Sequence, residues 1–441
     1  MKKLNITFCS FPDFAGNAKA LYEYMVKTYN DNMNYTWIVY NEATVEILKK
    51  KGINAILIGT DEFKKYIPKT NVFFTTQGNL DGDKLKAKNS IYIELWHGVG
   101  PKPSGFAQEN PSKDDIRGYE NIGEVVDYFI VPSDFWKTIW GATFKVEYSR
   151  IKSLGMPIFD YFKSADGKYN LSKILNRDLS KYKKIIMYMP TFRKGFNHND
   201  VLNKSGNVFN IRKDYDFEKL NKYLEKNMYL LCIKPHPGEM SKFAIKESEN
   251  IAIVSESKML EHQISVNEIM NAFDLLITDY SSIGTEFLFL NRPVLFNVCD
   301  IEEYKKNRGL LFGDSDFWFP GPTFRTQKEL IEETEKLLND KNYYLNEREN
   351  KKKLWFGSLK DGGCKQICCF LFENNNISTN VKRHKSEIIE LRLLEKKQKS
   401  IIQEQTQTIK KLTESDIRLK QIEASKSWKL LEKIRKIGKQ G

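Results

Sequence analysis

Two histidines directly follow apolar, strand-like segments of the sequence. The first, His97, lies between Trp96 and Gly98 after the run NSIYIEL, and the second, His236, closes the segment KPH, which opens with Lys234 after the run MYLLCI. Histidine can accept or donate a proton near neutral pH, and glycine lets a backbone approach a ligand closely. If the two strands face one crevice, both imidazoles and the Lys234 ammonium could surround a charged group such as a pyrophosphate. The alternative is that each histidine is structural, with His97 packed beside Trp96.

A possible anion site follows the buried strand FDLLIT. The chain continues with Asp279, Ser281 and Ser282, and a helix is expected to open directly after them. Serine hydroxyls and the free N–H groups of a helix N-terminus can bind an anion. Glu286 lies one helical turn beyond Ser282, where a carboxylate could accept hydrogen bonds from ribose hydroxyls. The alternative, compatible with the first, is an N-cap at Ser281 or Ser282 with Glu286 completing a capping box.

A weaker signal is the segment MYMPTFRKGF, which again leaves a strand, at Thr191 and Arg193. A guanidinium forks onto two oxygens, so Arg193 would suit a phosphate. Surface arginines are common, and the segment alone therefore decides little.

The elements that must position these residues form two alternating series of strands and helices. The first expected strands are 4–8, 35–40, 53–58, 72–75, 91–95 and 126–131, and the second series has 185–189, 228–233, 251–254, 275–278 and 294–298. Such alternation predicts βαβ units and parallel sheets. We expect an α/β fold of two Rossmann-like, doubly wound domains, residues 1–165 and 180–373, that face a cleft. The interval 164–184 is polar and is expected to lack structure.

Residues 380–441 differ in character from the rest. Apolar residues recur there at threes, fours and sevens, which predicts a long amphipathic helix and a possible homo-oligomer through a coiled coil, although Gln398 and Gln405 interrupt the seam. Residues 381–441 carry 17 Lys and Arg against 8 Asp and Glu, within a chain of net charge +13. The basic, Trp-containing end SKSWKLLEKIRKIGKQG predicts contact with an anionic membrane surface. The alternatives are a solvated helix that packs back on the body, or an apolar stripe for subunit contact.

Length and composition exclude several classes of protein. At 441 residues, with 41% hydrophobic and 13% aromatic residues, the chain can bury two cores, which excludes wholesale disorder. The start, MKKLNITFCSFPDF, is expected to be a strand and no signal peptide, and no run of 18 apolar residues suggests a membrane span. Scattered cysteines favour a cytoplasmic protein, and the cluster Cys364, Cys368 and Cys369 is expected to be buried thiols without zinc. The basic excess has few interleaved aromatics, so no nucleic-acid partner is expected.

Together, LWHG…PSGF, MPTFR, KPHP and ITDYSS…E…RPVLF have an order and spacing that resembles the CDP-glycerol glycerophosphotransferase family, the teichoic acid primases and polymerases. The resemblance covers roughly residues 70–360 and implies a glycosyltransferase B-type fold. It implies that His97 and His236 are catalytic, one deprotonating the acceptor hydroxyl and the other supporting the pyrophosphate. The donor-binding set is then expected to be Gly98, Thr191, Arg193, Lys234, Asp279, Ser281, Ser282, Thr285 and Glu286.

The implied reaction is attack of an acceptor hydroxyl on the alditol-bearing phosphate of CDP-glycerol or a related CDP-alditol, with release of CMP. The acceptor would be lipid-linked or a polymer, the product a teichoic-acid-like or capsular cell-surface polymer, and the place the inner face of the cell membrane. No metal or other cofactor is implied, because cationic side chains and helix dipoles can offset the pyrophosphate charge.

Two departures from the family pattern bear on the donor. Relatives usually have Thr where this chain has Val99, and often Asp where it has Glu286. These changes leave the alditol more open than the nucleotide. One alternative is a nucleotide-sugar-dependent glycosyltransferase of the same fold, with His97 as its base. Another is a coiled-coil scaffold with an inactive transferase-like body, which the intact histidines and DYSS disfavour.

Overall fold

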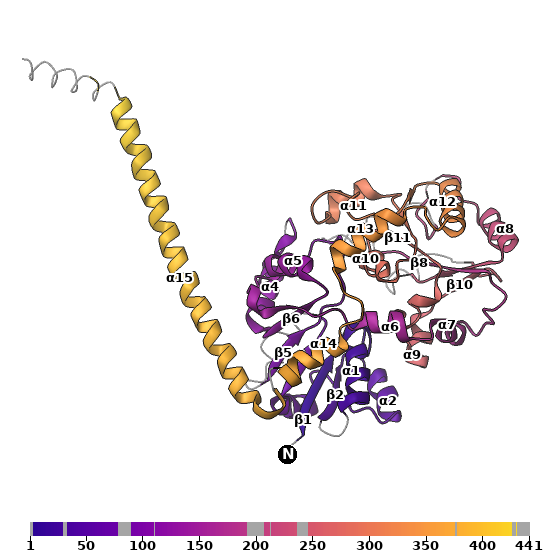
Figure 1. Cartoon of the computed structure of the whole chain (residues 1–441), viewed down its shortest axis with the longest axis horizontal. Coiled ribbons are helices and arrows are strands. Elements are labelled where there is room, and N and C mark those ends of the chain that lie inside the picture. The colour runs from indigo at the N-terminus through magenta and orange to yellow at the C-terminus, as the bar shows by residue number, and fades with distance from the viewer. Residues whose placement is uncertain are drawn as a thin grey trace, which may run out of the picture. The chain divides into compact units, whose positions relative to one another are not determined.

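The computed structural model describes residues 3–29, 33–77, 90–109, 111–191, 207–211, 213–235, 246–374, 377–425 and 429 of the chain. The chain divides into two compact units, Met1–Val381 and Lys382–Gly441. The strands of the described residues form two parallel sheets, both in the first unit (Figure 1). We call the parts around these sheets the first half and the second half.

The first sheet has the strand order β3-β2-β1-β4-β5-β6-β7. Its strands are β1 (Leu4–Cys9), β2 (Met33–Val39), β3 (Ala55–Leu57), β4 (Val72–Thr75), β5 (Ile91–Glu94), β6 (Tyr128–Val131) and β7 (Ile151–Ser153). The helices are α1 (Gly16–Tyr29), α2 (Glu42–Lys50), α3 (Asp61–Tyr66), α4 (Lys113–Val125), α5 (Asp134–Phe144) and α6 (Ile158–Ser164). Strands β4, β5 and β6 are buried throughout, as strands covered by helices on both faces must be. The winding direction reverses between β1 and β4, which is the topological switch point where ligands gather.

The second sheet has the order β10-β9-β8-β11-β12-β13, with its switch point between β8 and β11. Its strands are β8 (Lys184–Met189), β9 (Tyr229–Ile233), β10 (Ile251–Ile253), β11 (Leu275–Thr278), β12 (Val294–Asn297) and β13 (Thr323–Phe324). The helices are α7 (Gly167–Leu175), α8 (Phe217–Asn227), α9 (Glu256–His262), α10 (Ser282–Phe287), α11 (Ile301–Arg308), α12 (Gln327–Asn339) and α13 (Leu345–Phe356), and α14 (Cys364–Cys368) follows them and packs on α1 of the first half. The predicted α/β fold with two doubly wound parallel sheets is confirmed.

The prediction that 164–184 lacks structure is wrong, because α7 fills part of this interval. The Asp166 side chain caps the helix by accepting a hydrogen bond from the Tyr169 N–H at 3.1 Å. Leu171, Ile174 and Leu175 lie at helical spacing and are buried. Polar residues lie between them, so this apolar stripe was not recognised in the sequence.

The chain returns to the first half after the second sheet. The Ser133 hydroxyl donates to the Trp355 carbonyl at 2.7 Å, and the Cys364 N–H donates to the Asp160 carboxylate at 3.0 Å. Cys364 and Cys368 are buried thiols, as predicted, whereas Cys369, the first residue of the following π-helical turn, Cys369–Asn374, is partly exposed, so the prediction is wrong for this residue. The domain boundaries 1–165, 180–373 and 380–441 stay a prediction.

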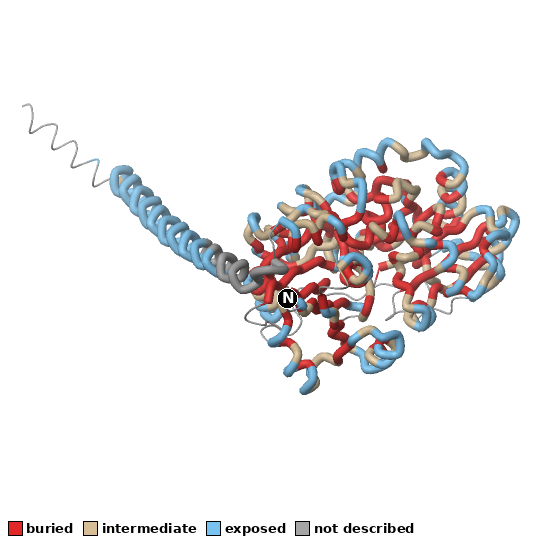
Figure 2. The backbone as a smooth tube through the Cα atoms, turned by 60° about the horizontal axis from the view of Figure 1, so that its bottom comes forward, coloured by how far each residue is buried: buried red, intermediate tan, exposed pale blue. Residues whose placement is uncertain are grey.

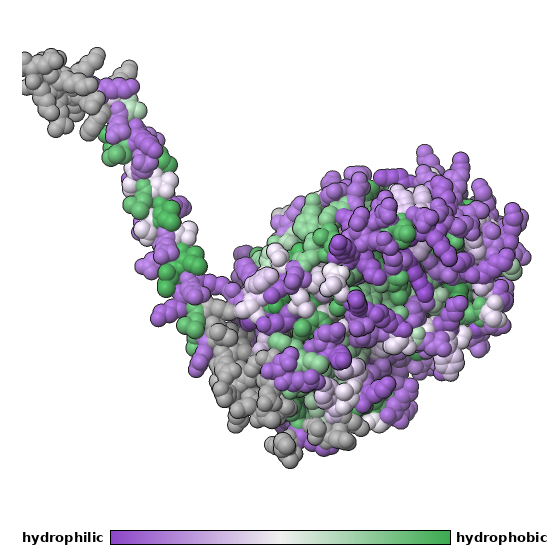
Figure 3. Space-filling view, in the orientation of Figure 1, coloured by the Kyte–Doolittle hydropathy of each residue, from purple (hydrophilic) through white to green (hydrophobic). Residues whose placement is uncertain are grey.

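A 48-residue helix, α15 (Ile377–Ala424), confirms the predicted long C-terminal helix. Figure 2 shows its described part as exposed, and Figure 3 shows apolar side chains alternating with hydrophilic ones along it. These exposed apolar residues are Ile389, Leu393, Leu394, Ile401, Ile402, Ile409, Leu412, Ile417, Leu419 and Ile422. The predicted membrane-binding end lies outside the described residues apart from Ser425 and Lys429. Within the described chain, no helix is both long and apolar enough to cross a bilayer.

Candidate active site

Three neighbouring strands of the second sheet, β9, β8 and β11, end in predicted site residues. Lys234 follows β9, Thr191 follows β8 and Asp279 follows β11. Both carboxylate oxygens of Asp279 accept a hydrogen bond from the Thr191 N–H, each at 2.9 Å. Asp279 is buried, and it joins the two strand ends that flank the switch point. The structure therefore brings these two predicted residues together where parallel sheets bind ligands.

Helix α10 starts beyond this point, with Ser281 as its N-cap. The Ser281 side chain makes no capping hydrogen bond, and the capping box with Glu286 is not formed. With Ser281 as the N-cap, the third helical position is Gly284, so Glu286 lies too far along the helix to make this reciprocal bond. The predicted N-cap at Ser281 or Ser282 is thus confirmed as the start of the helix, whereas the predicted capping box with Glu286 is wrong.

The Glu286 carboxyl group is buried against the segment that follows β5. Its Oε1 accepts a hydrogen bond from the Val99 N–H at 3.2 Å, and the Ser282 hydroxyl is a second partner. Burial raises the pKa of Glu286 from 4.5 to about 8, against the lowering effect of both hydrogen bonds. At neutral pH the group is therefore mostly protonated, and it can donate as well as accept.

Glycines make this contact between the two halves possible. A Cβ on Gly98 would lie 2.5 Å from Glu286 Oε1 and 2.7 Å from Ser282 Oγ. A Cβ on Gly100 would lie 2.7 Å from the Ser282 Cα. Such distances are well inside van der Waals contact, so only glycine fits both positions. The predicted residues Gly98, Ser282 and Glu286 meet here directly.

His97 is held by an unusual backbone conformation at the preceding residue. Trp96 has a φ of 53°, a left-handed value that a bulky side chain rarely adopts. The Asn17 side-chain amide on α1 donates to the Trp96 carbonyl at 2.9 Å, and the Glu94 carboxylate accepts from the Trp96 N–H at 2.7 Å. The Trp96 ring lies 4.3 Å from the His97 ring. These contacts orient the imidazole, and they also show that His97 packs beside Trp96 as the structural alternative proposed.

The imidazole of His97 is arranged as a proton acceptor. Its Nδ1 lies 3.1 Å from the Thr76 carbonyl, which can only accept, so Nδ1 carries the proton and Nε2 has a lone pair in the neutral ring. The residue is exposed. Desolvation by the protein around it lowers the pKa of His97, and Lys102 acts in the same direction. A neutral, oriented imidazole can serve as a general base.

Of the four remaining predicted site residues, the structure describes Lys234 and Thr285. The Lys234 ammonium is buried and lies 2.8 Å from the Glu256 carboxylate, which holds the cation at the end of β9. Thr285 is buried on α10. His236 and Arg193 lie outside the described residues.

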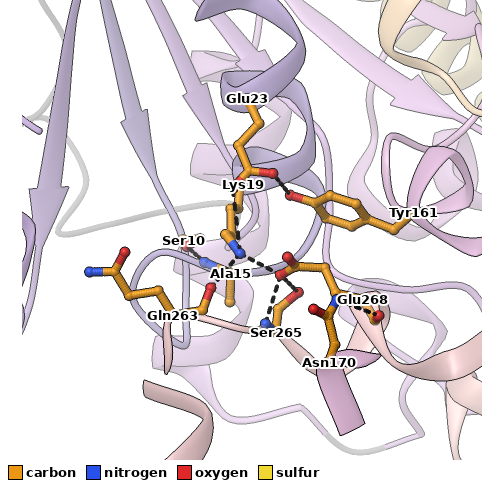
Figure 4. A network of polar contacts seen from close by, with 9 residues as sticks. All are labelled: Ser10, Ala15, Lys19, Glu23, Tyr161, Asn170, Gln263, Ser265 and Glu268. Carbon is orange, nitrogen blue, oxygen red and sulfur yellow. Dashed lines mark hydrogen bonds and ion pairs between the residues drawn. The ribbon is translucent and has the colours of Figure 1, made fainter. Parts of the chain in front are cut away.

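A second polar contact joins the two halves (Figure 4). Lys19 is only 1% exposed, and its ammonium contacts the Glu268 carboxylate and donates to the Gln263 carbonyl at 2.7 Å. On the same helix, Glu23 lies 3.5 Å from Lys19 and accepts from the Tyr161 hydroxyl at 2.7 Å. Apolar packing adds to the interface, since the Phe159 and Phe289 rings stack 4.2 Å apart. The two halves thus share one packed interface around the candidate site.

Several residues that build the site were not singled out from the sequence. Asn17, Thr76 and Glu94 position His97, and the Val99 N–H holds Glu286. Each contact joins segments far apart in the chain, or uses a backbone atom, so residue type alone carries no signal for it. A cavity of about 150 Å³ lies elsewhere in the second half, lined by residues such as Phe209 and Tyr215, and contains no predicted site residue. Among the described residues, no cluster of His, Cys, Asp or Glu side chains could hold a metal ion.

Two Rossmann-like sheets in one unit, with the loop that follows an oriented histidine of one half packed against a buried carboxyl group of the other, define a fold of the glycosyltransferase B type. The chain belongs to the CDP-glycerol:poly(glycerophosphate) glycerophosphotransferase family, whose profile matches residues 1–372. This membership makes it an enzyme and confirms the resemblance inferred from the motifs.

Similar proteins agree with this assignment. The teichoic acid poly(glycerol phosphate) polymerase of Bacillus spizizenii is 27% identical over 341 residues, 74% of this chain and 82% of that protein. The teichoic acid glycerol-phosphate primase of Bacillus subtilis is 28% identical over 342 residues, again 74% of this chain and 82% of the relative. A solved structure of the wall teichoic acid polymerase TagF covers 86% of this chain and 89% of its own, with a TM-score of 0.67 and 24% identity, and confirms the fold.

Proposed function

We propose that this enzyme transfers glycerol phosphate, or a related alditol phosphate, from a CDP-alditol to an acceptor hydroxyl and releases CMP. The acceptor is lipid-linked or a polymer, and the product belongs to a teichoic-acid-like or capsular surface polymer. The observation that carries the proposal is the direct contact of the His97-Gly98 loop with Ser282 and Glu286. It brings the loop that follows the proton acceptor of one half against polar groups of the other. The names of the matching relatives support the donor and the product.

In the proposed reaction, His97 Nε2 removes the proton from the acceptor hydroxyl. The hydroxyl oxygen then attacks the alditol-bearing phosphorus, and the bond from this phosphorus to the bridging oxygen breaks, so that CMP leaves with that oxygen. Lys234 supplies positive charge at the end of β9, and His236 and Arg193 are proposed to contact the same pyrophosphate. Ser281, Ser282, Thr285 and Glu286 are proposed to hold the phosphate and ribose, with Gly98 allowing the close approach.

Asp279 and Thr191 are proposed to act on the donor through their shared hydrogen bonds, which set the strand ends at the switch point. We propose that no metal or other cofactor takes part, since fixed cations and backbone dipoles can stabilise the developing charge. The check is activity after dialysis against EDTA. Loss of activity that Mg²⁺ or Mn²⁺ restores would contradict this part of the proposal.

We propose that the enzyme works at the cytoplasmic face of the membrane, bound through its C-terminal helix. The support is the exposed apolar side chains of α15 and the excess of 17 basic over 8 acidic residues in 381–441. Deletion of residues 425–441 should weaken sedimentation with anionic vesicles and leave neutral vesicles unbound. Unchanged sedimentation together with a concentration-dependent dimer would assign the helix to subunit contact instead.

The test of the reaction uses purified protein, a crude membrane acceptor, and CDP-glycerol, CDP-ribitol and a panel of nucleotide sugars as donors. We expect acceptor-dependent CMP release from a CDP-alditol. Release of a nucleoside diphosphate from a sugar donor would instead identify a glycosyltransferase of the same fold. If none of these donors is used, the remaining interpretation is a scaffold with an inactive transferase-like body.

A further inference from the structure

An exposed aromatic ring lies in the loop after β1, beside the switch point of the first sheet. This residue, Phe11, is the second one after β1 and is 61% exposed. Its ring lies 6.1 Å from the ring of Tyr40, edge to face at 84°, and Tyr40 directly follows β2. Single exposed apolar residues are common on proteins and need no explanation. Phe11 differs from such residues in how its ring is supported and in what lies beside it.

The loop that carries Phe11 is fixed by its own hydrogen bonds. The Ser10 hydroxyl donates to the Pro12 carbonyl at 2.8 Å and accepts from the Ala15 N–H at 3.1 Å. The Asp13 carboxylate accepts from the Tyr40 N–H at 2.9 Å, which ties the loop to the end of β2. A large apolar ring is thus presented to solvent on a rigid support. Such preorganisation lowers the entropic cost of binding a ligand.

A chain of contacts leads from this ring to the proposed base. The Tyr40 hydroxyl lies 3.5 Å from the Gln77 side-chain oxygen. Gln77 directly follows Thr76, whose carbonyl accepts the hydrogen bond from His97 Nδ1 at 3.1 Å. Phe11, Tyr40 and Gln77 therefore belong to the same wall of the first half as His97.

We propose that Phe11, buttressed by Tyr40, is a stacking platform for a pyranose ring of the acceptor, which brings the reactive hydroxyl to His97. This inference rests on the proposed function, and it names the acceptor as a saccharide. The C–H face of a pyranose is apolar and slightly positive, and it complements the negative face of an aromatic ring. The Tyr40 hydroxyl and the Gln77 amide supply hydrogen-bonding groups at the rim, as sugar sites require.

The charge beside the platform favours a neutral sugar over a chain of alditol phosphates. The Asp13 carboxylate belongs to this loop and would repel a phosphate, whereas the Lys19 ammonium, 5.5 Å from the centre of the Phe14 ring, is already paired with the Glu268 carboxylate. The cytosine of the donor is a less fitting occupant, because the predicted donor-binding residues of α10 belong to the second half. Both occupants remain distinguishable outcomes of the test.

The experiment compares full-length wild type with Phe11→Ala, the conservative Phe11→Trp, and Tyr169→Ala as a control. Tyr169 is a matched aromatic, 54% exposed, on α7 in the second half. The ligands are butyl pyranosides of common hexoses and N-acetylhexosamines, with butyl glycerol phosphate as the anionic counterpart. Binding is measured by saturation-transfer NMR without donor, and steady-state KM values for acceptor and CDP-glycerol follow.

We expect wild type to bind at least one pyranoside, and Phe11→Ala to weaken binding and raise the acceptor KM about fivefold to tenfold, as for one lost aromatic contact of roughly 1 kcal/mol. Phe11→Trp and Tyr169→Ala should stay within about twofold of wild type. The inference is overturned if no pyranoside binds to wild type, or if Phe11→Ala changes neither binding nor the acceptor KM. It is also overturned if Phe11→Ala weakens the binding of butyl glycerol phosphate by as much, or raises only the KM for CDP-glycerol. Phe11-dependent sugar binding by a protein that releases no CMP would refute the proposed function and leave the platform standing.

Discussion

Replacing Gly98 by alanine tests the contact between the two halves with a single methyl group. The added Cβ would lie 2.5 Å from Glu286 Oε1 and 2.7 Å from Ser282 Oγ, where ordinary contacts begin near 3.4 Å. The carboxyl group cannot simply swing away, because doing so would break its hydrogen bond to the Val99 N–H and leave a buried polar group unpaired. Forced overpacking of this kind costs about 1 to 3 kcal/mol. If that cost falls on the productive arrangement of the loop, kcat/KM drops by a factor of about 5 to 150.

The assay is CMP release from the donor that wild type uses, with thermal unfolding measured in parallel. Gly118→Ala is the matched control, because a Cβ there, inside α4, meets nothing within 4 Å. That control should keep full activity and gain up to about 1 kcal/mol of stability from helix propensity.

A second substitution separates steric overlap from other effects. Glu286→Asp shortens the side chain by one methylene and withdraws the carboxyl from the new methyl group. We expect the double variant Gly98→Ala/Glu286→Asp to lose less activity than the two single losses combined, with a coupling of about 1 kcal/mol. Wild-type kcat/KM in Gly98→Ala, or strictly additive losses in the double variant, would refute the reasoning.

Three other predictions use the same site. His97→Gln should abolish CMP release and leave the unfolding temperature unchanged, and full activity of this variant would show that His97 is not the base. Because desolvation lowers the pKa of His97, the kcat/KM of wild type should fall on the acid side only below the ordinary pKa of histidine. Since the pKa of Glu286 is raised from 4.5 to about 8, the folded state holds this proton longer than the unfolded state, so its contribution to stability falls as pH rises through that window. The free energy of unfolding of wild type, measured in urea relative to Glu286→Gln, should therefore fall by about 2 kcal/mol from pH 6 to pH 8, and a constant difference would contradict the shift. Asn17→Ala should lower the free energy of unfolding by about 2 kcal/mol and slow CMP release, because it frees the Trp96 carbonyl and the Ile158 N–H in a buried place; an unchanged rate would show that His97 needs no such support.

Local sequence was sufficient for the elements and for where their chemical residues lie along the chain. Strands such as β5 and β11 are short apolar runs because both faces are buried, so their ends could be read directly, and with them the positions of His97 and Asp279. The start of α10 was predictable because serines, which are favoured at helix N-caps, follow the end of β11. Helix α7 was missed because its buried stripe, Leu171, Ile174 and Leu175, is too short to stand out among polar neighbours.

Tertiary structure alone decided how these residues act. Val99 and Glu286 are 187 residues apart in the chain, and no local pattern predicts a hydrogen bond between a backbone N–H and a carboxyl group at that separation. The raised pKa of Glu286 and the proton on His97 Nδ1 follow from burial and from the Thr76 carbonyl, which are properties of the packed chain. Residue type and periodicity determine elements because these depend on near neighbours. Protonation, orientation and the fit of Gly98 depend on atoms that only folding brings together.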